Sequence, residues 1–193
     1  MIPRIMTTVH EKQQAQISLH VSADIRSGEF PRSSPSSCVI QYSLVSLQSS
    51  NWEVVSGEAS GTTQRSFGDG SFLVWNCPLD CSFAARHFRG WPRLLLTLFA
   101  KDWLGRDYVF GYGSCYVPTA TGFCIKSIQI FRPRATSWFR DMMGYLTCER
   151  PSLIDPEKSF TTLRGGTTRR TIPMVNTGCT IEVQFQTVCD IAN

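Results

Sequence analysis

Apolar and polar residues alternate at both ends of this chain, over residues 17–23 and again over 180–188. Successive side chains of a β-strand point to opposite faces, so strict alternation indicates a strand with one buried and one wet face. The first of these strands is predicted to end at Ser27-Gly28, before the turn-forming segment 31–37. Both ends of the chain are therefore predicted to lie in an antiparallel sheet.

Between these ends, branched and aromatic residues recur in short runs that are separated by turn signals. Pro78 is expected to interrupt one run, and 56–70 is expected to be a long exposed loop with at most one weak strand. Arg93–Ala100 is continuously apolar, as in a strand buried on both faces. Further strands are predicted at 38–47, 52–55, 72–76, 79–85, 108–117 and 122–131.

One stretch departs from this pattern, because Thr136–Leu146 spaces its apolar residues as a helix does. Trp138 belongs to that apolar face, and Ser137 is a plausible N-cap. Residues 1–15 show no periodicity and are predicted to be a flexible tail. The predicted fold is all-β, an antiparallel sandwich with one short helix late in the chain, in a single domain over residues 16–189.

Composition narrows the function classes. The 193 residues are 42% hydrophobic and 18% charged, which supports a folded core and excludes disorder for the chain as a whole. A net charge of +4, from 19 basic and 15 acidic residues, falls short of the basic stripe typical of nucleic-acid binding. Neither a secretory signal nor an apolar run near the ~20 residues of a membrane helix is present, so we expect a cytoplasmic protein.

The eight cysteines suit that compartment as free thiols, mostly within apolar runs. Cys77 and Cys81 have equal parity in a strand, which favours core packing over metal or redox chemistry. The three histidines stand outside any nucleophile or metal motif, and Gly111–Gly113 lacks the lysine and helix of a phosphate loop. We therefore expect a non-enzymatic protein without a cofactor.

The most informative segment is 90–118. Its plainest interpretation is a β-hairpin whose loop, Asp102–Asp107, uses Gly105 for a positive φ. In that interpretation Trp91 and Trp103 are packing residues at the end of a sheet.

The same segment also resembles the B9-domain family. The residues that carry the resemblance are Gly90, Trp91, Pro92, Gly105, Arg106, Asp107, Gly111, Tyr112, Gly113, Val117 and Pro118. Two further stretches, 73–80 and 136–139 with Asp155-Pro156, favour one particular type within the family. The resemblance runs from about residue 16 to 188.

The resemblance implies a variant of the C2 β-sandwich and a location at the ciliary transition zone, beside the basal body. It implies a scaffold subunit of a Meckel-syndrome-type, tectonic-associated complex that supports cilium assembly and the ciliary diffusion barrier. The partners implied are the two other types of B9-domain protein.

Calcium-binding C2 domains gather several aspartates at one end, because Ca²⁺ takes 6–8 oxygen ligands. Asp102 occupies one expected ligand position, but Ala100 occupies another and Tyr108 a third, with Asp107 one step out of register. We expect no calcium dependence.

The remaining candidates are surface contacts. Trp103 and Leu104, flanked by Lys101 and Arg106, form an apolar tip with a basic rim. Arg86, Arg89 and Arg93 surround Trp91 in the neighbouring turn. Trp138 is a further candidate. Protein partners are the favoured interpretation, and the alternative is a calcium-independent module on anionic membranes.

Overall fold

The structure is a computed structural model that describes residues 16–31, 35–46, 52–69, 71–102, 104–133, 153 and 174–192. Every regular element in these residues is a strand. The strands are β1 (Gln16–Glu29), β2 (Ser37–Val45), β3 (Glu53–Gly57), β4 (Ser60–Thr62), β5 (Ser66–Phe67), β6 (Phe72–Ala85), β7 (Arg93–Lys101), β8 (Asp107–Tyr116), β9 (Gly122–Pro133) and β10 (Met174–Ala192). The predicted tail 1–15 and the predicted helix Thr136–Leu146 lie outside the described residues.

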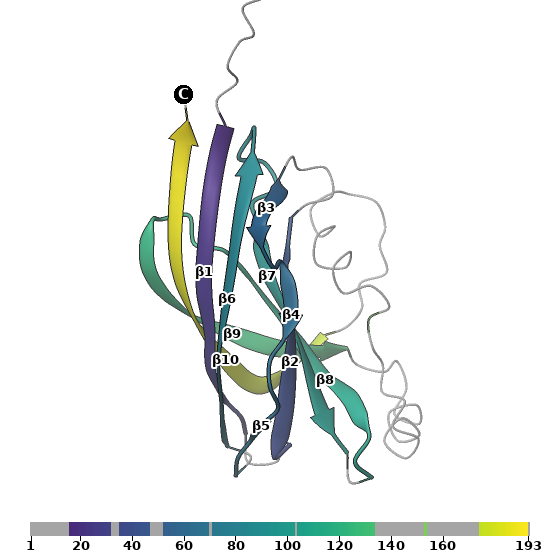
Figure 1. The fold of residues 1–193 in the computed structure, drawn as a ribbon. Helices are drawn as coiled ribbons and strands as arrows, with labels where there is room; N and C mark the ends of the chain where they lie inside the picture. Colours follow the sequence, from purple (N-terminus) through teal and green to yellow (C-terminus); the bar gives the residue numbers. More distant parts are fainter. Residues whose placement is uncertain are drawn as a thin grey trace, which may run out of the picture.

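The strands pair in one antiparallel path, β3-β6-β1-β10-β9-β8-β7-β2-β4, with β5 added on β2. The long strands β6, β1 and β10 run side by side, and β2, β7 and β8 form a second group (Figure 1). β9 meets β8 through one residue pair, Tyr112 and Phe131. The path therefore curls at this corner, and the described chain is the predicted antiparallel β-sandwich.

The two strands predicted from the alternation near the two ends of the chain are present in the structure. β1 pairs with β10 along its whole length, and the inward residues of both strands are buried. In β7 every residue from Leu94 to Leu98 is buried, as expected for a strand covered on both faces. Trp75 joins the two groups of strands, because its indole N–H donates to the carbonyl of Cys38 at 3.2 Å. Cys77 and Cys81 share the core-facing side of β6, as their parity predicts.

Two details of the prediction are wrong. The expected loop 56–70 contains the end of β3 together with β4 and β5, because these short strands extend the sandwich at its edges. Pro78 does not interrupt β6. The carbonyl of Asp80 faces β3, where it accepts a hydrogen bond from the N–H of Glu58 at 3.3 Å, so the proline nitrogen two residues earlier faces the same way. β3 pairs only as far as Cys81, so no ladder bond is lost at Pro78.

The same part of β6 contains a bulge opposite the stretch Ile25–Ser27 of β1. Asn76 lies in it with a φ of 44°, which asparagine adopts more readily than most residues. The bulge lets the long strand bend across the core while its inward parity is kept on both sides.

Candidate functional site

The turn between β6 and β7 is fastened to the end of β8 by Trp91. Gly90 has a φ of 72°, a left-handed conformation that brings the indole back over the sandwich end. The indole N–H of Trp91 donates to the carbonyl of Val117 at 2.9 Å, and the Val117 N–H donates to the carbonyl of Pro92 at 3.1 Å. This reciprocal pair of hydrogen bonds explains why Gly-Trp-Pro and Val-Pro occur together in the motif.

Trp91 is also the middle ring of three aromatic residues. The Trp52 ring meets it edge to face at 5.2 Å and 84°, and Phe88 stacks on it at 6.2 Å and 22°. Trp52 is buried and donates its indole N–H to the carbonyl of Arg89 at 3.0 Å. Phe88, by contrast, is 54% exposed. The three rings thus lead from the core to the surface, and nothing in the sequence pattern identified Trp52 as the partner of Trp91.

The arginines around Trp91 differ in their surroundings. Arg86 and Arg89 are exposed on the turn, and neither forms an ion pair within the described part of the chain. Arg93 is half-buried at the start of β7, where its guanidinium lies 4.2 Å from the centre of the Tyr116 ring. Of these three arginines, Arg86 and Arg89 therefore present their positive charge to solvent beside the exposed Phe88.

At the other end of β7, Asp102 organises the hairpin turn. Its Oδ1 accepts from the N–H groups of Leu104 and Arg106 at 2.9 and 2.8 Å, and its Oδ2 accepts from Nε of Arg106 at 3.1 Å. Gly105 has the predicted positive φ, 76°, and donates its N–H to the Asp102 carbonyl at 3.0 Å. The Asp102 side chain is only 5% exposed, so these donors replace the water that it loses.

The carboxylates of this turn are thus held by donors of the chain itself. Both oxygens of Asp102 are occupied, Asp107 pairs with Nη2 of Arg65 at 2.7 Å, and Ala100 is fully buried. Among the described residues, no group of three acidic, histidine or cysteine side chains is arranged to hold a metal ion. A calcium ion at Asp102 would have to displace the hydrogen bonds that shape the turn.

The two turns with candidate contact residues do not form one patch. Trp91 precedes β7 and Leu104 follows it, and a strand of nine residues spans about 30 Å at ~3.3 Å per residue. Leu104 and Arg106 are exposed at the far turn. Trp103 and Trp138 lie outside the described residues.

The third part of the motif, Gly111-Tyr112-Gly113, lies where β8 approaches β9. A Cβ on Gly111 would fall 2.6 Å from Cγ2 of Ile130, and a Cβ on Gly113 would fall 2.7 Å from Cδ1 of the same residue. Both glycines are therefore needed for the close approach of β9 at this corner. Tyr112 points the other way, is buried, and accepts a hydrogen bond on its hydroxyl from the N–H of Leu153 at 2.9 Å.

Five of the described cysteines have a thiol pKa above its ordinary value. Burial raises the pKa of Cys38 to about 12 and that of Cys115 to about 11, and desolvation also raises the pKa of Cys77, Cys81 and Cys189. A nucleophilic cysteine requires the opposite shift, toward a thiolate at neutral pH. These five cysteines lie in the core or pack against it.

The fold and the three motif sites define a class of protein: a C2-like β-sandwich whose distinctive residues shape turns and strand contacts. No helix among the described residues is long and apolar enough to span a membrane. Residues 19–188 match the B9-C2 family, described as ciliary basal body-associated B9 proteins. The chain belongs to this family.

Relatives of two types support the assignment. The chain is 32% identical to B9 domain-containing protein 1 of Xenopus laevis over 142 residues, which cover 72% of this chain and 70% of the relative. It is 31% identical to the human protein of that type, with 72% and 68% covered. It is also 31% identical to B9 domain-containing protein 2 of Rattus norvegicus over 110 residues, with 56% and 62% covered. The predicted similarity to B9 domain-containing protein 1 is confirmed.

Proposed function

We propose that this chain is a non-catalytic structural subunit of a ciliary transition-zone complex, where it binds the other B9-domain proteins. The family match over residues 19–188 carries the proposal, because it spans nearly the whole sandwich. The roles of the motif residues agree with it: Trp91 joins two strands, Asp102 shapes a turn, and Gly111 and Gly113 admit β9. Such residues produce a rigid surface for partners.

In this role the subunit supports cilium assembly and the diffusion barrier at the ciliary base, as part of a Meckel-syndrome-type, tectonic-associated assembly. It resides in the cytoplasm at the basal body and transition zone. Its partners are the two other types of B9-domain protein, and it uses no cofactor and binds no nucleic acid.

The test is affinity capture of the tagged chain from ciliated cells, with captured proteins identified by mass spectrometry. A tagged C2 domain of unrelated function serves as the control bait. Recovery of other B9-domain proteins with this chain, and not with the control, is the expected result. A folded, soluble bait that captures none of them would overturn the proposal.

A second candidate is a calcium-independent module on anionic membranes. The exposed ring of Phe88 between Arg86 and Arg89 favours it, because an aromatic tip with a basic rim suits a lipid interface. Flotation with vesicles containing phosphatidylserine tests this alternative. Binding that is lost in the double variant Arg86→Glu/Arg89→Glu, at unchanged thermal stability, would support it, whereas binding unchanged in that variant would reject this turn as the contact.

A further inference from the structure

The outer face of the sheet formed by β6, β1, β10 and β9 has its side chains in register across four strands. These outward residues alternate with the buried residues of the same strands. One row consists of Pro78, Asp24, Gln184 and Ile125, and the next consists of Asp80, Ser22, Gln186 and Phe123. In each row, polar side chains on β1 and β10 are followed by an apolar side chain on β9, the direct neighbour of β10.

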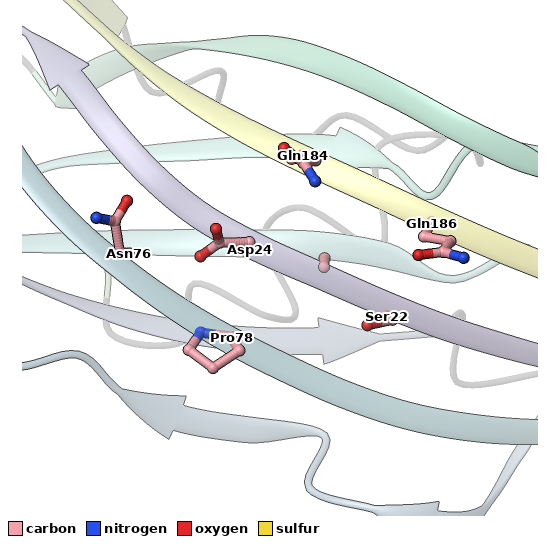
Figure 2. Close-up of a pocket in the computed structure, with 7 residues that line it drawn as sticks. Ser22, Asp24, Asn76, Pro78, Gln184 and Gln186 are labelled. Atoms are coloured by element: carbon pink, nitrogen blue, oxygen red, sulfur yellow. The ribbon is translucent and has the colours of Figure 1, made fainter.

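A hollow of about 300 Å³ opens in the polar part of this face. Figure 2 shows its lining from three strands: Asn76 and Pro78 of β6, Ser22 and Asp24 of β1, and Gln184 and Gln186 of β10. This volume is at the lower end of the range for small-molecule pockets, which suits one inserted side chain better than a larger ligand.

Asp24 supplies the charge of the hollow. Its Oδ1 atom is buried and has no hydrogen-bond partner among the described residues. A buried carboxylate oxygen without a donor is unfavourable, because the water that it loses is not replaced. Rotation of the carboxylate toward a cationic donor in the hollow would supply the missing hydrogen bond and pair the two charges.

The apolar part of the face is open. Phe123 is 64% exposed and Ile125 47% exposed, and Val188 lies exposed one row further along β10. The outer face on the opposite side of the sandwich differs, because Leu95, Thr97 and Tyr112 are buried there. Large apolar side chains grouped on an open sheet face are typical of a protein-binding surface.

The charge of this face is opposite to that of the chain as a whole. Asp24, Asp80, Glu182 and Asp190 all point outward here, in a protein of net charge +4. His20 lies 3.2 Å from Asp80, and Arg26 lies 3.6 Å from Glu182, so two of the four carboxylates have a basic neighbour. The net charge of this face is therefore negative, which repels an anionic membrane and attracts a basic protein surface.

We propose that this outer face is the docking surface for a partner protein that inserts a lysine or arginine into the hollow. The inserted cation pairs with Asp24, and apolar side chains beside it on the partner cover Phe123 and Ile125. The inference rests on the proposed function, since the partner is then another B9-domain protein. It locates the contact on a sheet face, away from the motif turns and from the exposed Phe88.

The test uses the purified full chain and B9 domain-containing protein 2 from the same organism, with the dissociation constant measured by biolayer interferometry. Asp24→Asn removes the charge at nearly constant shape, and Phe123→Ser removes the apolar contact. Glu58→Gln, at an exposed position between β3 and β4, is the matched charge control. Phe67→Ser on β5 is the matched apolar control, since Phe67 is 75% exposed. Thermal midpoints of all variants are compared first.

We expect Asp24→Asn and Phe123→Ser each to raise the dissociation constant at least tenfold, and the two controls to change it less than twofold. The salt dependence of binding should also be weaker in Asp24→Asn, because one screened ion pair is lost. Unchanged affinity in Asp24→Asn and Phe123→Ser would overturn the docking surface and leave the proposed function standing. Failure of the unmodified chain to bind would overturn the docking surface and the direct pairing of these two types, and the affinity capture then decides whether the wider proposed function stands.

Discussion

Replacing Trp91 by phenylalanine tests whether the motif tryptophan is a structural fastener. The change removes the indole N–H that donates to the carbonyl of Val117 at 2.9 Å. Val117 is buried, so its carbonyl is left without that donor, at a cost of about 1–2 kcal/mol. The smaller ring also weakens the edge contact with Trp52 and the stack on Phe88, by about 0.5–1 kcal/mol together. We expect the free energy of unfolding to fall by about 2 kcal/mol.

The assay is equilibrium unfolding in urea followed by circular dichroism, which does not depend on the tryptophan removed. In a chain of this size, 2 kcal/mol corresponds to a fall in Tm of about 4–8 °C. Phe88→Ala is the control, because this ring is exposed and contributes only the stack on Trp91. This variant should lower the free energy of unfolding by less than about 1 kcal/mol. A loss below about 0.5 kcal/mol in Trp91→Phe would refute the fastening role and favour a surface role for the motif.

The other structural residues give further tests. Asp102→Ala should lower the free energy of unfolding by about 1–2 kcal/mol, because three donors lose their acceptor. Millimolar calcium should leave the Tm of the unmodified chain unchanged. A rise in Tm would contradict the assignment of the Asp102 carboxylate to the turn. Gly113→Ala should lower the free energy of unfolding by about 1–3 kcal/mol, because the added methyl group crowds β9. Gly105→Ala should lower it by about 1–2 kcal/mol through the positive φ alone. Asparagine tolerates a positive φ, so Gly105→Asn should recover most of that stability, whereas Gly113→Asn should recover none. The folded-state pKa values of Cys38 and Cys115, about 12 and about 11, are raised above the ordinary value of 9.0, so their contribution to stability is complete below pH 9 and is lost as the pH rises toward 11–12. Urea midpoints measured from pH 8 to 11 should therefore fall above pH 9, and a flat profile would contradict the burial of these thiols.

The strands with regular alternation could be predicted from the sequence, because the period of two is a local property of an extended chain. Residues 17–23 and 180–188 belong to β1 and β10 in the structure, and Leu94–Leu98, within the continuous apolar run, is buried on both faces as predicted. The positive φ at Gly105 followed from its place in a hairpin loop. The motif residues were found because they occur in a fixed order along one segment.

What the sequence did not determine depends on contacts between distant segments. Pro78 was expected to end a strand, and only the position of β3 shows that its nitrogen needs no partner. Trp52 meets Trp91, and Arg65 meets Asp107, across intervals with no periodic pattern. The composition of a segment does not predict such pairings, because they form only when the curled sheet brings distant segments together.

The proposed docking surface is also a feature that the sequence alone did not predict. Asp24, Gln184 and Ile125 are ordinary outward positions of three strands, and each taken alone predicts only a solvated face. The register of β1 on β10 and of β10 on β9 places them in one row. The sequence by itself determined the family, the strands and the turns, since these depend on local pattern and residue order. The tertiary structure alone decided which outward side chains share a face, because that depends on the pairing of strands far apart in the chain.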